Sequence, residues 1–362
     1  MMMRIQDSNG NTVTRPHEVT NIFLNHLCQK FGPLNMDRES VLTLQAHTQP
    51  LDPASAESLE RPITAEEVIT AIRSGAKHES PGINSICHEF YSANWEMVHL
   101  DLLELLNHMF LSNNVTPRQK HGVLICIPET DGDGTPNGYH PISLLNTDYK
   151  ILVRILGLRL RQVMAAHLQH TQFCGVPGHS ILDAASQIRD MIAHAENTGT
   201  PMCILSLDFH NAFDCIAHDN MFHILQSYSI WLEFIDLLHA MYSDTTVSVQ
   251  INDTIAGTIL IQSGVRQGCP LSMVLYALCL HHLLSMLDHS LQGLQVGRGK
   301  GWRPVLAYAD DVTIFVTHPV ESATTRQAIH CFEKVTGAQL NPSKSKAMAL
   351  GGWTALATEL VH

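Results

Sequence analysis

Two adjacent aspartates stand between two short apolar runs near the end of the sequence. In the stretch LAYADDVTIF, Asp310 and Asp311 follow the run 305–308 and precede the run 312–316. Runs of this length and composition are typical of strands, and the polar residues between them are typical of a tight turn. We therefore predict a β-hairpin with both carboxylates at its tip. Because aspartate also favours turns for structural reasons alone, the hairpin by itself does not define a site.

The composition is that of an ordinary globular chain. Its 362 residues, 45% of them hydrophobic, are enough to bury the cores of about two domains. The longest apolar stretch, 271–287, is interrupted by His281 and His282, so we expect no membrane span. The nine cysteines are odd in number and form no C-x-x-C pair, which argues against a disulfide framework and a zinc site. We expect free thiols and an intracellular compartment.

The charge balance argues weakly against a chain whose main role is to grip phosphate backbones. Lys and Arg number 22 against 34 Asp and Glu, which gives a net charge of −12. The 23 histidines include no H-E-x-x-H motif and no tight ligand cluster. We interpret pairs such as His281 and His282 as surface or packed helix positions.

Caps and periodicity predict a mixed sequence of helices and strands. The first 60 residues are polar and turn-rich around one helix near 17–30, and we interpret them as a linker or N-terminal extension. Thr64 and Glu67 have the spacing of a capping box, so a helix should begin at Thr64. Further helices are predicted to include 102–110 and to lie near 147–167, 179–195, 219–228, 232–242 and 271–289, with strands at 122–127, 202–207, 246–251 and 257–262.

A third acid, Asp208, follows the apolar strand predicted at 202–207. Two strands that each present an acid at one end can lie side by side in one sheet. Neighbouring carboxylates repel one another, and bound divalent cations relieve that repulsion. Mg²⁺ suits such a site because it binds few protein carboxylates and fills its other positions with water and substrate phosphates. Two such ions would serve phosphoryl transfer.

The region from about 62 to 350 resembles the reverse transcriptase of non-LTR (LINE-type) retrotransposons. The resemblance rests on eight motifs that occur in the family's order. They are PITAEEV (62–68), SPG (80–82), YHPISLLNTDYKI (139–151), QFCGVPG (172–178), LDFHNAFD (207–214), GVRQGCPLS (264–272), YADD (308–311) and NPSKS (341–345). A group II intron-type reverse transcriptase is a less favoured relative, because the YHPISLLN pattern and the connector-like stretch 5–12 fit the LINE type better.

The resemblance implies a role for each matching residue. Asp208 and Asp310 would coordinate two Mg²⁺ ions, for which Mn²⁺ is a possible substitute, with Asp311 as a third carboxylate. Lys344 would donate a proton near the pyrophosphate. The residues implied around the nucleotide are Phe209, Phe213, Gln267, Gly268 and His140. Phe213 would exclude a ribose 2′-OH, although it is also a plausible core aromatic. Gly268 would let the backbone approach the nucleotide and template closely.

The resemblance also implies an architecture and partners. The expected fold is α+β: a right-hand palm, with an antiparallel sheet and the Asp-Asp hairpin, plus mostly helical fingers. We expect a linker at 1–60, fingers at 61–200, a palm at 201–350 and a truncated tail at 351–362. The partners would be an RNA template, a DNA primer and dNTPs, in the cytoplasm or the nucleus. Because the chain ends at His362, we expect a truncated copy of a longer polyprotein, without the helical thumb.

Two departures from the family pattern leave present activity open. Glu129 and His140 stand where the family usually has Lys and Arg facing the triphosphate. One interpretation is a decaying or domesticated remnant with at most weak RNA binding, in which CpG decay has converted Arg codons to His codons. The other is a working lineage that draws cations from elsewhere. The candidate sources are Arg266 and three residues of the basic stretch 297–303, namely Arg298, Lys300 and Arg303.

Overall fold

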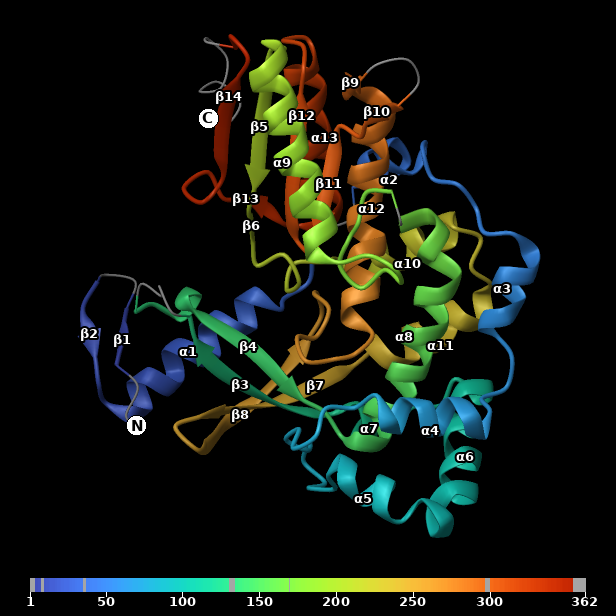
Figure 1. Cartoon of the computed structure of the whole chain (residues 1–362). Helices are drawn as coiled ribbons and strands as arrows, with labels where there is room; N and C mark the ends of the chain where they lie inside the picture. Colours follow the sequence, from blue (N-terminus) through green and yellow to red (C-terminus); the bar gives the residue numbers. More distant parts are fainter. Residues whose placement is uncertain are drawn as a thin grey trace. The chain divides into compact units, whose positions relative to one another are not determined.

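The computed structural model describes residues 4–7, 10–34, 37–129, 134–168, 170–296 and 300–353. The chain forms two compact units, each assembled from three separate segments. Unit 1 consists of Met1–Leu34, Glu57–Leu158 and Trp231–Ser272. Unit 2 consists of Asn35–Ala56, Arg159–Ile230 and Met273–His362. Figure 1 shows the elements along the chain. The mixed α+β class predicted from the sequence is confirmed.

Unit 1 is built on a four-stranded sheet of order β4-β3-β7-β8, in which β3 and β7 are parallel and the other pairs antiparallel. Its strands are β1 Ile5–Gln6, β2 Thr12–Val13, β3 Gly122–Pro128, β4 Tyr139–Leu144, β7 Thr245–Ile251 and β8 Thr254–Ile261. Its helices are α1 Pro16–Lys30, α4 Ala65–Arg73, α5 His88–Ala93, α6 Trp95–Ser112, α7 Pro117–Lys120, the short η1 Pro136–Gly138 and α11 Leu232–Tyr242.

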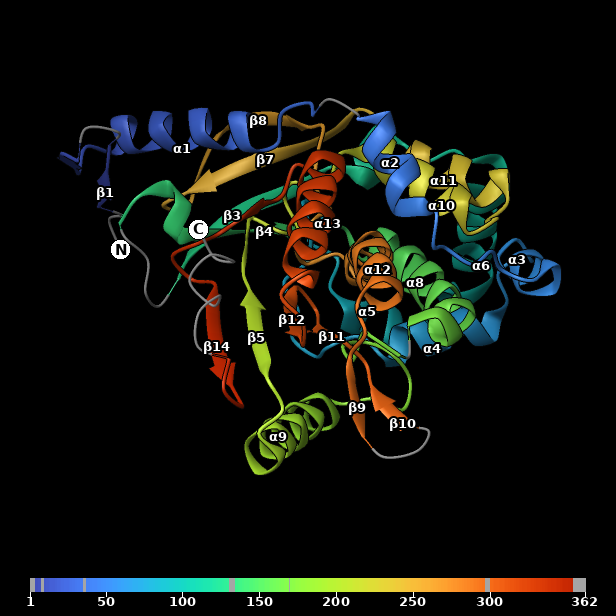
Figure 2. The same cartoon turned by 90° about the horizontal axis from the view of Figure 1, so that it is seen from above.

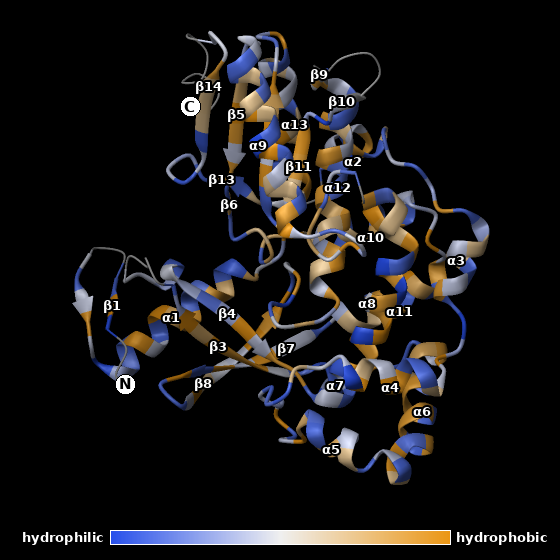
Figure 3. Cartoon of the chain, viewed as in Figure 1, coloured by the Kyte–Doolittle hydropathy of each residue, from blue (hydrophilic) through white to orange (hydrophobic). Residues whose placement is uncertain are grey.

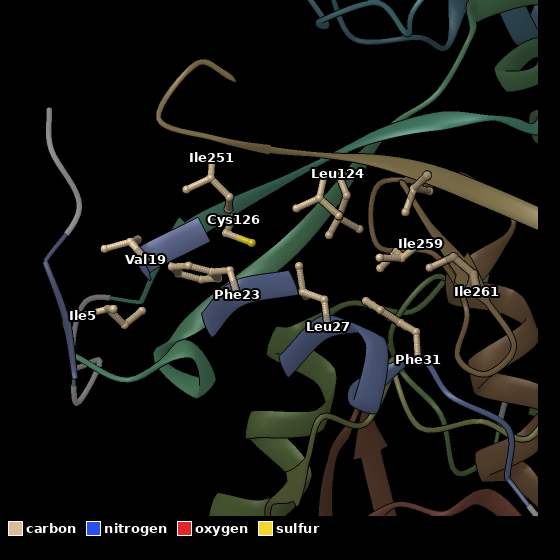
Figure 4. Close-up of a cluster of buried hydrophobic side chains, with 12 residues drawn as sticks. Ile5, Val19, Phe23, Leu27, Phe31, Leu124, Cys126, Ile251, Ile259 and Ile261 are labelled. Carbon is tan, nitrogen blue, oxygen red and sulfur yellow. The ribbon is translucent and has the colours of Figure 1, made fainter. Parts of the chain in front are cut away.

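Helix α1 belongs to the core of unit 1, which differs from the linker expected for the first 60 residues. Val19, Phe23 and Leu27 recur every four residues and are fully or almost fully buried. They form one apolar face that packs with Leu124 and Ile259 of the sheet (Figure 4). Each such side chain contributes about 1.5–3 kcal/mol when it leaves water. Because the outer face of α1 is polar, the composition of this segment does not indicate that its other face is apolar and buried.

A local signal placed the start of helix α4 correctly. Helix α4 has Thr64 as its N-cap, and the capping box is complete: the Glu67 amide donates to the Thr64 hydroxyl, and the Thr64 amide donates to the Glu67 carboxylate. These bonds satisfy donors that the first helical turn leaves unpaired. The predicted start at Thr64 is therefore confirmed.

Unit 2 is built on an antiparallel four-stranded sheet of order β11-β12-β5-β14. Its strands are β5 Met202–Leu207, β6 Phe209–His210, β9 Leu294–Val296, β10 Lys300–Trp302, β11 Val305–Tyr308, β12 Asp311–Val316, β13 Gln339–Leu340 and β14 Lys346–Leu350. Its helices are α2 Arg38–Gln45, α9 Ile181–Thr198, α10 His218–Ser227 and α13 Glu321–Thr336. Helices α3 Pro53–Leu59, α8 Thr147–Leu168 and α12 Ser272–Ser290 include residues of both units.

The sheet of unit 2 is buried on both faces near its centre. Five of the six residues of β5 are buried, and Met202 and Ile204 pack with Met191 and Ala195 of α9. Figure 2 shows this sheet from a second direction. Figure 3 shows that β11 of this sheet, like β3 of unit 1, consists mostly of hydrophobic residues. A strand buried on both faces reads as a continuous apolar run. This explains why β5 was recognisable from MCILSL alone.

Candidate active site

The hairpin predicted at 305–316 is present, with its turn at Ala309 and Asp310. Strands β11 and β12 pair from Val305 with Ile314 to Tyr308 with Asp311. Ala309 has a φ of 57°, in the left-handed region that residues with a Cβ seldom adopt. Such a conformation costs of order 1–3 kcal/mol and persists only where the surroundings hold it. The turn that carries Asp310 is therefore held in place by other contacts.

The strand order brings Asp208 beside the hairpin. Strand β12 pairs with β5 so that Val312 lies opposite Leu207. Asp311 precedes Val312 and Asp208 follows Leu207, so the two acids lie at the same end of these neighbouring strands. Partial burial and the neighbouring Asp208 carboxylate raise the pKa of Asp311. This is the repulsion expected between like charges held close together.

A loop near the end of the described chain fixes Asp208. The Asn341 side chain donates to Asp208 Oδ2 at 2.9 Å, and the Asn341 amide donates to the Asp208 carbonyl at 2.8 Å. The Asp208 amide donates to the Ser345 hydroxyl at 3.1 Å. Lys344 lies in this loop and its side chain is exposed. The NPSKS motif thus orients the carboxylate, and it presents Lys344 from the same short segment.

Gln172 holds the strained turn, a role that the sequence did not reveal. Its Nε2 donates to the Ala309 carbonyl at 3.1 Å, and the Ala309 amide donates to its Oε1 at 3.0 Å. The side chain is 0% exposed, and the neighbouring backbone of Thr171 and Phe173 bonds Ala307 in β11. The QFCGVPG motif indicated that this region matters, but it did not indicate that its glutamine bonds Ala309, which lies 137 residues later in the chain.

The two aromatics predicted near the nucleotide differ in exposure. Phe213 is half-buried and stacks on Tyr276, with ring centroids 4.4 Å apart. Burial and the nearby Asp310 carboxylate raise the pKa of Tyr276 well above its ordinary value, so this pair lies beside the acids. Phe209 is instead buried against Phe332 at 5.3 Å. Its side chain packs in the core, which leaves its backbone for any contact with a nucleotide.

The other predicted nucleotide-binding residues, His140, Gln267 and Gly268, belong to unit 1. The Ser143 amide of β4 donates to the Gln267 carbonyl at 2.9 Å, which joins the 263–270 turn to that strand. Gly268 has a φ of 91°, and a Cβ there would lie 2.9 Å from the Ser143 carbonyl oxygen. Close packing within unit 1 is by itself a sufficient reason for glycine at this position.

Glu129 and His140, the two departures from the family pattern, form a pair. His140 Nε2 lies 3.4 Å from Glu129 Oε1, and the two side chains are 55% and 28% exposed. The register of β3 and β4 brings them together, because Ile127 lies opposite His140 and Pro128 opposite Tyr139. The pair consists of a carboxylate and an imidazole, so it presents less positive charge than the Lys and Arg usual in the family.

The structure corrects the hypothesis that Arg266 and Arg303 replace those cations. Arg266 is buried 4.8 Å from the ring centroid of Tyr149, and it donates to the Lys120 carbonyl at 2.9 Å. Arg303 forms an ion pair with Asp288. A buried guanidinium such as that of Arg266 is not free to meet a phosphate, and the guanidinium of Arg303 already has a carboxylate partner. Arg298 and the side chain of Lys300 lie outside the described part of the chain.

The acids fit a divalent metal that completes its coordination with substrate. Asp208, Asp310 and Asp311 offer only oxygen donors, and burial together with the Asp208 carboxylate raises the pKa of Asp311. Within the described residues, no group of three or more His, Cys, Asp or Glu side chains is placed so that it could hold a metal ion, so a metal at these acids would need ligands from the substrate or from water. An open set of carboxylates is the donor arrangement that Mg²⁺ shares with substrate phosphates.

Two further findings concern the chain as a whole. All nine cysteines are free thiols, five of them buried. Among the described helices, none combines the length and apolarity that a membrane crossing requires.

Comparison with known proteins identifies the family. The family model described as reverse transcriptase (RNA-dependent DNA polymerase) matches residues 127–358. The Transposon TX1 uncharacterized 149 kDa protein of Xenopus laevis is 34% identical over 296 residues, which are 82% of this chain and 23% of that protein. The Pol polyprotein from type-1 retrotransposable element R2 of Popillia japonica is 27% identical over 80% of this chain and 40% of its own length.

Two other similarities extend this comparison. The probable RNA-directed DNA polymerase from transposon BS of Drosophila melanogaster is 25% identical over 74% of this chain and 30% of its own length. Among solved structures, apo telomerase from Candida tropicalis truncated from its C-terminal domain has a TM-score of 0.46 and 15% identity, covering 69% of this chain and 55% of that one. This chain spans less than half the length of each of these three curated relatives. Because the family model matches more than half of it, the chain belongs to the reverse transcriptase (RNA-dependent DNA polymerase) family, in the branch of the non-LTR retrotransposons.

Proposed function

We propose that this chain is an RNA-directed DNA polymerase domain that extends a DNA primer on an RNA template. The proposal rests on the position of Asp208 and Asp311 at the same end of two neighbouring strands, with Asp310 in the adjoining turn. Asn341 fixes the Asp208 carboxylate, and Gln172 fixes the turn that carries Asp310. The chain that contains these acids belongs to the reverse transcriptase family. In this proposal unit 2 corresponds to the palm, and unit 1 contains the fingers.

The chain's own residues would orient the reacting groups. Asp208 and Asp310 would hold two Mg²⁺ ions, or Mn²⁺ in their place, with Asp311 as the third carboxylate. The bound ions would lower the pKa of the primer 3′-OH and neutralise the departing pyrophosphate. Lys344 would give a proton to that pyrophosphate. Asn341 would keep the Asp208 carboxylate aimed at the site, because it bonds one oxygen and leaves the other for a ligand.

Substrate selection would depend on Phe213. Its ring is braced by the stack on Tyr276, so it cannot easily swing away from a nucleotide that carries a 2′-OH. Contacts of His140, Gln267 and the Gly268 backbone with the nucleotide remain a prediction from the resemblance, as do the cytoplasm and the nucleus as compartments. dNTPs, an RNA template and a DNA primer are the partners that this chemistry requires.

The test is primer extension on an annealed RNA template with dNTPs and Mg²⁺, then Mn²⁺. We expect the Asp310→Ala variant to lose about 10³-fold or more in rate, because a lost metal ligand removes several kcal/mol of transition-state stabilisation. Asp236→Ala, which removes an exposed carboxylate from α11, is the matched control and should extend normally. Equal rates for the two variants would contradict the proposed site.

A second candidate function is a non-catalytic remnant that binds RNA weakly. The pairing of Glu129 with His140 favours it, because this pair stands where the family carries two cations. Absence of extension by a folded wild-type protein would support the remnant. Extension gained by the double variant Glu129→Lys, His140→Arg would then show that the acids are competent and that triphosphate binding was lost.

A further inference from the structure

Tyr276, near the start of α12, lies beside two different parts of the candidate active site in unit 2. Its ring stacks on Phe213, with ring centroids 4.4 Å apart and an interplanar angle of 27°. Burial raises the pKa of Tyr276 well above its ordinary value, and the carboxylates of Asp310 and Asp311 contribute to that rise. One side chain therefore neighbours both the acids and the ring that the resemblance assigns to sugar selection.

Phe213 needs such a neighbour, because its own position leaves its side chain partly free. It lies in the turn after β6, where the Asp214 amide donates to the Asn211 carbonyl at 2.8 Å and Asn211 has a φ of 52°. These features fix the backbone of the turn. The side chain is only half-buried, so its rotamer depends on what packs against it. The stack on Tyr276 covers one face of the ring and opposes its rotation.

Tyr276 is itself held by packing alone. Its side chain is 1% exposed, and Leu275 and Leu278 beside it on α12 are fully buried. Its hydroxyl has no hydrogen-bond partner among the described residues, so no polar contact aims the ring. A side chain locked by close packing can fix the rotamer of the functional side chain that it touches. The positioning capacity of Tyr276 therefore resides in its ring.

We propose that Tyr276 determines how strongly the active site selects dNTPs over rNTPs, as a positioning residue that acts through the ring of Phe213. The inference rests on the function proposed above, in which Phe213 excludes a ribose 2′-OH. The two substrates differ by one hydroxyl, so selection depends on how firmly the wall that meets this hydroxyl is held. Without the ring of Tyr276, Phe213 would turn into the vacated space and admit the 2′-OH.

The test measures kcat/KM of the full chain for dCTP and for CTP in single-nucleotide extension of a DNA primer on an RNA template. We expect Tyr276→Leu to lower the ratio of the two values about 3- to 10-fold, the range that an aromatic pair contributes. The change should come from a higher kcat/KM for CTP, with kcat and KM for dCTP near those of wild type. A loss of folded protein would lower both values alike and leave their ratio unchanged.

The conservative variant Tyr276→Phe isolates the ring. It keeps the stack and removes only a buried hydroxyl without a partner, so it should fold and retain the wild-type ratio. Tyr276→Met fills more space than Tyr276→Leu and serves as a second variant if the latter fails to fold, as judged by thermal unfolding. Tyr228→Leu removes another buried tyrosine that contacts α12, and as the matched control it should leave the ratio unchanged.

A double-mutant cycle shows whether Tyr276 acts through Phe213. Phe213→Ala should lower the ratio by itself, and adding Tyr276→Leu should then produce no further change, because residues that act as a unit are not additive. A further fall in the double variant would overturn the inference. So would a wild-type ratio in folded Tyr276→Leu or Tyr276→Met, or a fall in Tyr276→Phe as large as that in Tyr276→Leu.

Failure of the proposed function would give a different result. Folded wild-type protein would then not extend the primer, or Phe213→Ala would leave the ratio unchanged. Either result would overturn the role of Phe213 in sugar selection, and the inference about Tyr276 with it.

Discussion

At the scale of single residues, the turn that carries Asp310 depends on Gln172. Gln172→Leu would remove both side-chain bonds to Ala309 and leave a strained turn without support. Because small misplacements of reacting groups cost as much as 10²-fold, we expect kcat for primer extension to fall about 10- to 100-fold with the KM for dNTP little changed. Single-turnover extension by a variant with near-normal thermal unfolding would measure this.

Two related variants separate positioning from stability. Gln172→Glu keeps an acceptor for the Ala309 amide but loses the donor to its carbonyl, so its rate should fall between those of wild type and Gln172→Leu. Gln162→Leu, on the exposed side of α8, is the matched control and should leave the rate unchanged. A raised KM with an unchanged kcat for Gln172→Leu would contradict a role in positioning Asp310.

Arg266 shows why single positions resist assignment from sequence. Its motif, GVRQGCPLS, suggested a cation near a nucleotide, yet the side chain is buried 4.8 Å from the ring centroid of Tyr149. Gly268 is similar, since the nearby Ser143 carbonyl explains it without a ligand. A motif indicates that a residue type is needed at a position. Only the contacts of that residue in the structure show whether it is needed for packing or for chemistry.

At the scale of elements, α1 is the clearest case of a segment whose role depends on packing. Phe23 is fully buried and meets Tyr139 edge-on, with ring centroids 5.1 Å apart. We expect Phe23→Ala to lower the free energy of unfolding by about 3–5 kcal/mol, as for other large-to-small changes in cores. Urea denaturation would measure the loss, with exposed Asn25→Ala as the control. A loss below about 1 kcal/mol would mean that α1 is a loose extension after all.

At the scale of the whole molecule, acid should destabilise the fold through two adjacent histidines of α12. Burial lowers the pKa of His281 to about 3 and that of His282 to about 4, from an ordinary value of 6.5. Between those values and pH 6.5 the unfolded chain binds protons that the folded chain does not, so stability falls as the pH drops below 6.5. At pH 5 the loss is about 2 kcal/mol for each histidine.

The measurement is the free energy of unfolding from urea titrations at pH 7 and pH 5. His282→Gln can keep the polar contact with Ser227 but cannot titrate, so it should remove about half of the pH-dependent loss that His281 and His282 cause together. An unchanged pH dependence in this variant would show that other groups cause the acid sensitivity.

The sequence by itself predicted most of the long helices, the strands β3, β5, β7, β8, β11 and β12, and the three acids at their strand ends. It did not predict helix α13 or strands β4 and β14. Caps, turn residues and apolar periodicity act within a few residues, so MCILSL, LAYADD and ITAEEV carried enough information. Only the tertiary structure decided that Gln172 holds Ala309, that Glu129 pairs with His140, and that each compact unit draws on three separate segments. The contact of Gln172 with Ala309 and the assembly of each unit join residues far apart in the chain. The pairing of Glu129 with His140 depends on strand register. Local sequence patterns contain neither kind of information.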